Sequence, residues 1–214
     1  LLVDVGLSVE EVETRVHVGD LISLRMPYTA LRGERVAGKG FDDRAAVVAI
    51  VACLEELARL RHTWDVYAVS TVQEEVGLRG AITSSYGIFP DLGIAIDVTF
   101  GEMPGVSDTE TVEVGGGPTI AVGPNIHPKV YEALVDTARR YEIPYQVDPA
   151  PGPTGTDAWA IQVSRSGVPT GLVGIPLRYM HNPVEMLDLG DIRRASRLLA
   201  LTISRLDEVD LSRY

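Results

Sequence analysis

Basic residues are scarce in this chain of 214 residues. It has 19 Lys and Arg against 30 Asp and Glu, which gives a formal net charge of -11 at pH 7. Binding to nucleic-acid backbones or anionic membrane surfaces needs clustered Lys and Arg, so this composition argues against both kinds of partner. An acidic excess arises from solvated acidic surfaces as well as from carboxylates that hold cations, so the charge alone does not choose between these two.

Cysteine is almost absent, since Cys53 is the only one. An intrachain disulfide is therefore excluded, and a reducing compartment, the cytoplasm, is expected. Cys53 lies in the apolar stretch 45–60, which favours a small buried side chain over a reactive thiol. The chain also lacks a run of ~18 apolar residues and the charged and apolar regions of a signal peptide, so we expect a soluble protein.

Tryptophan is limited to Trp64 and Trp159, which leaves few stacking platforms for a sugar chain. Phosphate-loop chemistry has no support either. The glycine cluster 115–118 is not followed by Lys-Ser or Lys-Thr, so it is interpreted as a turn rather than a nucleotide site.

Apolar helical and extended stretches alternate along the rest of the chain, which predicts an α/β fold with a mostly buried central sheet. Asp188 is a plausible N-cap for the closing helix, and Ser8 and Glu11 have capping-box spacing. The expected strands are 1–5, 21–24, 66–72, 92–98, 143–147 and 168–175, and the expected helices are 8–13, 45–60, one beginning at 80–83, 128–141, 158–164 and 189–206.

Four acidic or imidazole residues stand next to these apolar segments, where α/β sheets place their ligand sites. They are Asp42, Glu75, Asp97 and His181. Any one of them alone is more simply interpreted as an N-cap or a solvated loop acid. Several together favour a functional site.

Adjacent Glu74 and Glu75 follow a predicted strand, and neighbours on an extended segment point in opposite directions. One can bind a metal ion while the other faces the reacting water. Hydrolysis at a metal needs this division, because the ion acidifies a water and a separate carboxylate takes its proton. Asp42, a third acid, is a candidate to bridge two ions. Carboxylates with histidine suit zinc, cobalt or manganese better than calcium.

Four segments in this order resemble the glutamyl/deblocking (tetrahedral) metallo-aminopeptidases, and the resemblance runs from residue 1 to about residue 206. The segments are Gly-Lys-Gly-Phe-Asp-Asp-Arg-Ala at 38–45, Thr-Val-Gln-Glu-Glu-Val-Gly-Leu-Arg-Gly at 71–80, Asp-Val-Thr at 97–99 and Arg-Tyr-Met-His-Asn-Pro-Val-Glu at 178–185. The resemblance implies a phosphorylase/hydrolase-like zinc exopeptidase fold, a mixed central sheet with helices on both faces. It also implies a co-catalytic site with two divalent ions, zinc or cobalt, in the intact enzyme.

Matched position by position, the resemblance implies Glu74 as the general base and Asp42 as the bridging ligand. It implies terminal metal ligands at Glu75, Asp97 and His181. Asp43 matches the residue that follows the bridging ligand through an unusual peptide bond. Asp157 and Arg178 match substrate-contacting loop positions; helix capping and sheet-edge salt bridging are the equally open alternatives for this pair.

One expected element is missing from the pattern. Family members carry a further His ligand in a His-x-Asp motif before the Asp-Asp-Arg region, and none of His17, His62 and His127 lies in such a motif. Asp42, Glu75 and His181 can hold one ion with an open position, whereas the second site keeps only Asp42 and Asp97. The chain opens without Met on a strand-like segment, so we expect a truncated enzyme. Residues 1–33 are the expected remnant of an inserted β-barrel domain, and 34–214 the catalytic domain.

The leading hypothesis is a metal-dependent aminopeptidase that removes N-terminal residues from peptides and, by resemblance, assembles into a homo-oligomer, with a dodecamer as the candidate size. An inactive fragment or paralogue serving as an assembly module is the non-enzymatic alternative. A glycoside hydrolase is the other enzymatic one, but its carboxylates must face each other ~5–9 Å apart across a sugar. Neighbouring Glu74 and Glu75 do not do so. The preferred N-terminal residue stays open.

Overall fold

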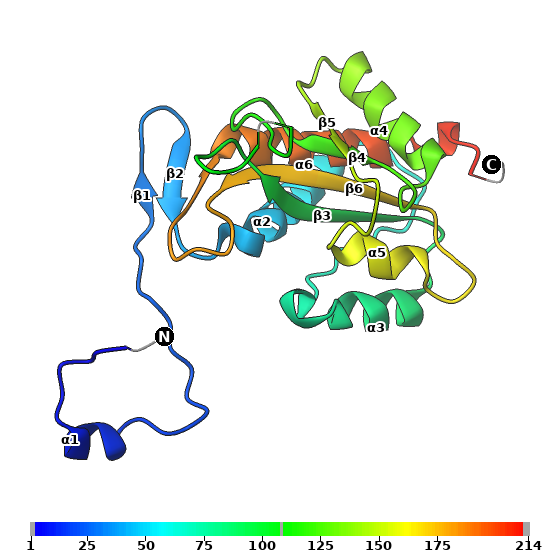
Figure 1. Ribbon diagram of the computed structural model, residues 1–214. Helices are drawn as coiled ribbons and strands as arrows, with labels where there is room; N and C mark the ends of the chain where they lie inside the picture. Colours follow the sequence, from blue (N-terminus) through cyan, green and yellow to red (C-terminus); the bar gives the residue numbers. More distant parts are fainter. Residues whose placement is uncertain (1–2, 108, 212–214) are drawn as a thin grey trace.

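A computed structural model describes residues 3–107 and 109–211 and shows an α/β fold (Figure 1). Helices and strands alternate along most of the chain, as predicted. In chain order the elements are α1 Val9–Glu13, β1 Thr29–Ala30, β2 Arg35–Gly38, α2 Phe41–Leu57, the 3-10 helix η1 Glu74–Val76, α3 Arg79–Ile88, β3 Gly93–Phe100, β4 Thr119–Val122, α4 Pro128–Arg140, β5 Gln146–Pro149, α5 Asp157–Gln162, β6 Thr170–Arg178, β7 Glu185–Asp188, α6 Leu189–Ile203 and the 3-10 helix η2 Leu206–Glu208.

The strands form one mixed sheet in the order β1-β2-β7-β6-β4-β5, with β3 on the other edge of β6. β3 and β6 run parallel over eight residue pairs, from Gly93 opposite Thr170 to Phe100 opposite Leu177. β2 and β7, and β6 and β7, pair antiparallel. Within the described residues β6 is the only strand that β3 pairs with, so the other edge of β3 carries no ladder.

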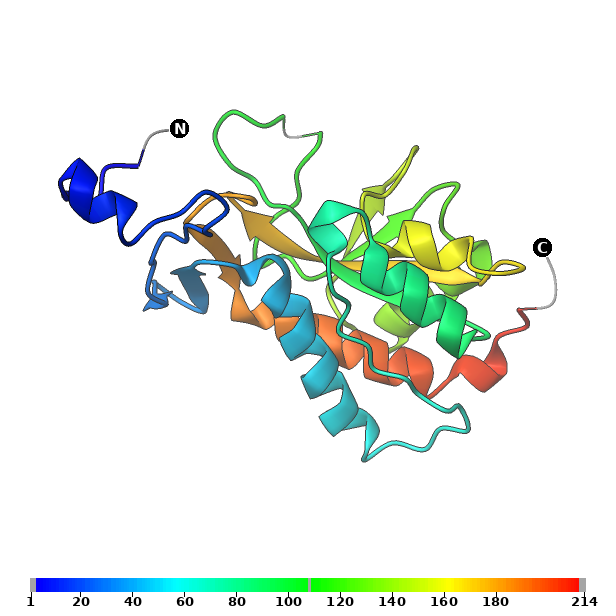
Figure 2. The same cartoon turned by 90° about the horizontal axis from the view of Figure 1, so that it is seen from below.

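Helices cover both faces of this sheet, which confirms the predicted fold class. Helices α2, α4 and α6 pack together on one face, and α3 and α5 lie on the other (Figure 2). The core between sheet and helices is apolar, and its fully buried members include Ile175, Leu177, Leu187 and Leu198. Burial of each such side chain stabilises the fold by about 1.5–3 kcal/mol.

The helix ends follow the predicted local signals. The Asp188 side chain accepts a hydrogen bond from the Gly190 N–H at 2.8 Å and caps α6. The predicted capping box of Ser8 and Glu11 is present in α1. In the described part of the chain, no helix is long and apolar enough to cross a membrane.

Two predicted strands are not formed in the described residues. The segment 66–72 has no strand pairing, and Tyr67 and Val72 are exposed, so the predicted buried strand is wrong. An apolar extended run becomes a buried strand only where a partner edge and a cover exist. The segment 21–24 is likewise unpaired and exposed, and residues 3–28 extend away from the sheet (Figure 1). The expected strand at 1–5 lies partly outside the described residues, and 3–5 form no strand.

Candidate metal site

The turn before α2 presents Asp42 and is fixed by several contacts. Gly40 has a left-handed backbone (φ 68°), and a Cβ there would collide with the Arg44 guanidinium. Arg44 in turn donates from Nε to the Gly40 carbonyl at 2.8 Å. Asp43 Oδ1 accepts the Ala46 N–H at 2.9 Å. The Asp42–Asp43 peptide bond is cis, so the unusual bond expected from the resemblance is present.

Glu74 and Glu75 lie in η1, not on an extended segment. The extended backbone assumed for them is therefore wrong, because Gln73 and Gly77 are left-handed and close a 3-10 turn between them. The two side chains nevertheless have different neighbours. Glu75 reaches the histidine described next, whereas Glu74 does not belong to that group.

His181 follows β6 in a turn where its own backbone is left-handed (φ 61°). Its Nε2 lies 3.2 Å from Asp42 Oδ2 and 3.4 Å from Glu75 Oε2. The three ligand atoms all lie within 4.8 Å of one another. Residues from three distant parts of the chain therefore meet at one point, as zinc-type ligand sets do. We call this group the Asp42–Glu75–His181 cluster.

Asp97 lies on β3 outside this cluster. Its Oδ1 accepts the Val98 N–H at 2.8 Å. Burial, followed by the charge of Asp43, raises the pKa of Asp97 to about 8. The structure thus brings together three of the four predicted ligands, while the charges of Asp43, Glu74 and Asp42 act on Asp97 and raise its pKa.

Burial raises the pKa of the other carboxyl groups here as well. The pKa of Asp42 rises to about 6, with Glu75 as the next cause, and the pKa of Asp43 rises to about 7. Burial and then the charge of Asp157 raise the pKa of Glu74 to about 6. Carboxyl groups gathered in this way repel one another and favour a bound cation.

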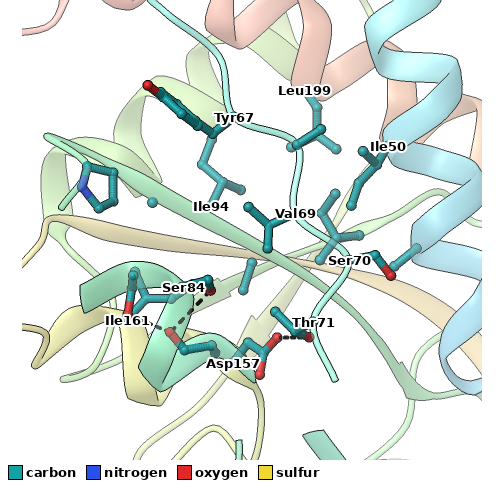
Figure 3. A pocket seen from close by; sticks show the side chains of 18 of the residues that line it. Ile50, Tyr67, Val69, Ser70, Thr71, Ser84, Ile94, Asp157, Ile161 and Leu199 are labelled. Atoms are coloured by element: carbon teal, nitrogen blue, oxygen red, sulfur yellow. Dashed lines mark hydrogen bonds between the residues drawn. The ribbon is translucent and has the colours of Figure 1, made fainter. Parts of the chain in front are cut away.

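Asp157 and Arg178 each keep an unsatisfied polar atom. Asp157 Oδ2 accepts a hydrogen bond from the Thr71 hydroxyl at 2.7 Å (Figure 3), while its Oδ1 is buried without a partner in the described residues. The Arg178 Nε is also buried and unpaired there. The N-cap of α5 is Thr156, so helix capping by Asp157 is wrong. Arg178 forms no salt bridge within the described residues.

A cavity of about 460 Å³ opens beside the free edge of β3. Its walls come from β3, α2, α6 and the segment 64–71, and apolar side chains such as Ile50, Val69 and Ile94 converge in it (Figure 3). Asp42, Glu74 and Glu75 also line it. The acidic site and an uncovered apolar wall therefore share one hollow.

The donor set fits a divalent transition metal. Two carboxylate oxygens and one imidazole nitrogen supply three ligands, and the exposed position of His181 leaves room for a fourth. Sequence reasoning missed two residues that support the site. Thr71 holds Asp157, and Glu185 binds the backbone of the Asp42 turn. Both lie in the quoted motifs, but their partners are set by tertiary structure.

The sequence of this chain matches a known protein family and several curated proteins. The family described as M42 glutamyl aminopeptidase matches residues 1–198. A lysyl aminopeptidase from Pyrococcus furiosus is 40% identical over 99% of this chain and 61% of its own length. The chain spans about three fifths of the length of such curated relatives.

Solved structures give the same picture. An aminopeptidase from the archaeon Desulfurococcus kamchatkensis superposes with a TM-score of 0.82 at 45% identity, covering 94% of this chain and 58% of that one. The TET1 peptidase of Pyrococcus horikoshii can assemble into a tetrahedron or a large octahedral shell. It superposes with a TM-score of 0.70 at 29% identity, covering 82% of this chain and 52% of that one.

Proposed function

Because this chain belongs to the M42 glutamyl aminopeptidase family, we propose that the protein containing it is a metal-dependent aminopeptidase that releases N-terminal residues from peptides. The observation that carries the proposal is the Asp42–Glu75–His181 cluster, whose ligand atoms lie within 4.8 Å of one another. Relatives named as aminopeptidases support a peptide substrate over a glycoside.

In this proposal Asp42, Glu75 and His181 would hold one zinc or cobalt ion, and Asp42 and Asp97 would contribute to holding a second. A bound divalent ion supplies Lewis acidity, which lowers the pKa of water and polarises the scissile carbonyl. Glu74 takes the proton of the attacking water and delivers it to the leaving amine. Burial is the largest cause that raises the pKa of Glu74 toward neutral pH, and a raised pKa suits a group that both accepts and donates a proton.

Asp157 and Arg178 are the proposed substrate contacts. Each has one buried polar atom without a hydrogen-bond partner among the described residues, Oδ1 of Asp157 and Nε of Arg178. Such atoms cost free energy unless they are paired. A peptide offers both a donor amine for the carboxylate and acceptor carbonyls for the guanidinium.

The second ion needs a ligand that these residues do not supply. The resemblance assigns that role to a His-x-Asp motif, and we propose that the part of the relatives unmatched by this chain provides it. The free edge of β3 and the apolar cavity beside it, next to Asp97, are where such a segment would pair and bury its side chains. Residues 34–214 would then be the catalytic domain, and 1–33 part of an inserted domain.

Assembly and location are proposed from the same relationship. A tetrahedral or octahedral particle is formed by the related TET1 peptidase, so a homo-oligomer, up to a dodecamer, is proposed for the intact protein. A cytoplasmic location is supported by the buried free thiol of Cys53.

Metal content tests the proposal directly. We expect this chain, dialysed against zinc, to bind about one ion by plasma mass spectrometry, because one site has three ligands. His181→Ala should abolish this binding, while His62→Ala, a change at an exposed histidine away from the cluster, should not. A longer protein that includes the proposed segment should bind about two ions. Failure of the wild-type chain to bind zinc or cobalt at all would favour the alternative of an assembly module.

A further inference from the structure

Glu185 is a buried carboxylate that the proposed reaction does not use. It begins β7, only 3% of its surface is exposed, and its register partner on β2 is Gly38. Within the described residues it forms no ion pair. A buried charge without a cationic partner is costly unless hydrogen bonds compensate it, so the contacts of this carboxylate need an explanation.

Those contacts lie on the turn that carries Asp42. Glu185 Oε2 accepts the backbone N–H of Phe41 at 2.5 Å and that of Asp42 at 3.3 Å. Hydrogen bonds to an ionised acceptor are stronger than those between neutral groups. The carboxylate therefore holds the main chain of two successive residues, one of which is the proposed bridging ligand.

The same turn packs directly on β2. A Cβ at Gly38 would lie 3.0 Å from the Phe41 ring, so the ring lies over the glycine that faces Glu185 in the register. Phe41 is thus held through its ring by β2 and through its N–H by β7. The side chain of Asp42 then starts from a main chain that the sheet has already placed.

We propose that Glu185 is a positioning residue for the metal centre, which fixes the backbone of Phe41 and Asp42 so that the Asp42 carboxylate meets Glu75 and His181. The inference rests on the proposed function, since it concerns the site that would hold the ion. Groups that orient metal ligands typically contribute ~10–100-fold to metal affinity. A loss of metal affinity in a chain that still folds would distinguish a role in orienting the ligand from a simple contribution to fold stability.

Four variants of the chain test this role. Glu185→Gln keeps an acceptor oxygen and the side-chain length, Glu185→Asp keeps the charge but shortens the reach, and Glu185→Ala removes both. Asp191→Ala is the control, because Asp191 is also a fully buried carboxylate whose oxygens accept two backbone N–H groups, those of Gly115 and Gly117, in addition to its ion pair with Arg194. It supports a turn that contains no proposed ligand.

Zinc affinity is measured by competition with a chromophoric chelator, and thermal unfolding of the metal-free chains is followed in parallel. Glu185→Ala and Glu185→Asp are expected to weaken zinc binding by ~10–100-fold, and Glu185→Gln by ~3-fold or less. Asp191→Ala should lower the melting temperature and leave zinc affinity unchanged. If Glu185→Ala does not fold, Glu185→Asp and Glu185→Gln still test the role. Both keep a polar side chain, but only Gln is long enough to reach the N–H groups of Phe41 and Asp42, so only Asp should lose zinc affinity.

Amide exchange gives a readout that needs no metal. The N–H groups of Phe41 and Asp42 should exchange at least ~10-fold faster in metal-free Glu185→Ala than in the wild type, because their acceptor is gone. If Glu185→Ala or Glu185→Asp binds zinc as tightly as the wild type, the positioning role is overturned, while the proposed function stands. Equal losses in Glu185→Gln and Glu185→Ala would overturn hydrogen bonding as its basis. A wild-type chain that binds no zinc would instead overturn the proposed function.

Discussion

Glu74→Gln is expected to lower kcat for aminoacyl-p-nitroanilide hydrolysis by about 10²–10⁴-fold, the usual contribution of a general acid–base residue. Gln has the shape of Glu but neither accepts nor returns a proton at neutral pH. Glu74 does not belong to the Asp42–Glu75–His181 cluster, so metal content should be unchanged. The measurement is kcat and KM at saturating metal, with metal stoichiometry on the same sample, in the longest form of the protein that contains this chain.

The neighbouring glutamate is the matched control. Glu75→Gln makes the same chemical change one residue away, but Glu75 Oε2 lies 3.4 Å from His181 Nε2 in the cluster. Its activity loss should therefore come with loss of metal, and added zinc should restore part of it. Glu74→Gln should not respond to added zinc. Full activity in Glu74→Gln, or loss of its metal, would remove Glu74 from the role of base.

Local sequence signals predict the framework of this fold well. Asp188 before α6 and Ser8 before α1 are predicted N-caps, and both form their hydrogen bonds in the structure. A cap depends on residues two or three positions away, so one stretch of sequence contains the whole interaction. The strands β3 and β6 are predicted for a similar reason, because continuous apolar runs are typical of strands in covered sheets.

The prediction of the site residues required the family resemblance as well as the residue types. Asp42, Glu75 and His181 lie in motifs that local patterns cannot bring together, because their contact depends on three separate turns. The two turns that present Glu74 and His181 contain left-handed residues, Gln73 and His181 itself, that simple propensities disfavour. The assumed extended backbone at Glu74 and Glu75 failed at such a residue.

The role of Glu185 could not be predicted from the sequence, because it depends on the long-range register of the sheet. Glu185 and Phe41 are 144 residues apart in sequence, and their hydrogen bond follows from the pairing of β2 with β7. Both strands have only four residues, too short for an alternating pattern to predict them. The segment 66–72 shows the converse, since its apolar pattern favours a buried strand while the described residues provide no partner for it.

The metal-free chain is expected to lose stability as the pH rises from 5 to 8. Burial raises the pKa of Asp43 from 3.8 to about 7 and that of Asp97 from 3.8 to about 8. Between these values the folded chain keeps protons that the unfolded chain has released, so rising pH favours unfolding. Summed over the two groups, we expect the free energy of unfolding to fall by about 6 kcal/mol, or roughly 12–24 °C in Tm for a chain of this size.

Scanning calorimetry in the presence of a chelator, at several pH values, measures the slope of Tm against pH. Two comparisons show which carboxyl groups cause this slope. The double variant Asp43→Asn/Asp97→Asn keeps acceptor oxygens for the Ala46 and Val98 N–H groups but has no carboxyl to titrate, so its slope should be much flatter. Asp136→Asn, at an exposed acid of α4, should leave the slope unchanged. Zinc should raise Tm more at pH 8 than at pH 5, because protons compete with the cation for its proposed ligand Asp42, whose pKa is raised to about 6. A wild-type Tm that rises between pH 5 and 8 without metal would show that these carboxyl groups ionise in the folded chain at little cost.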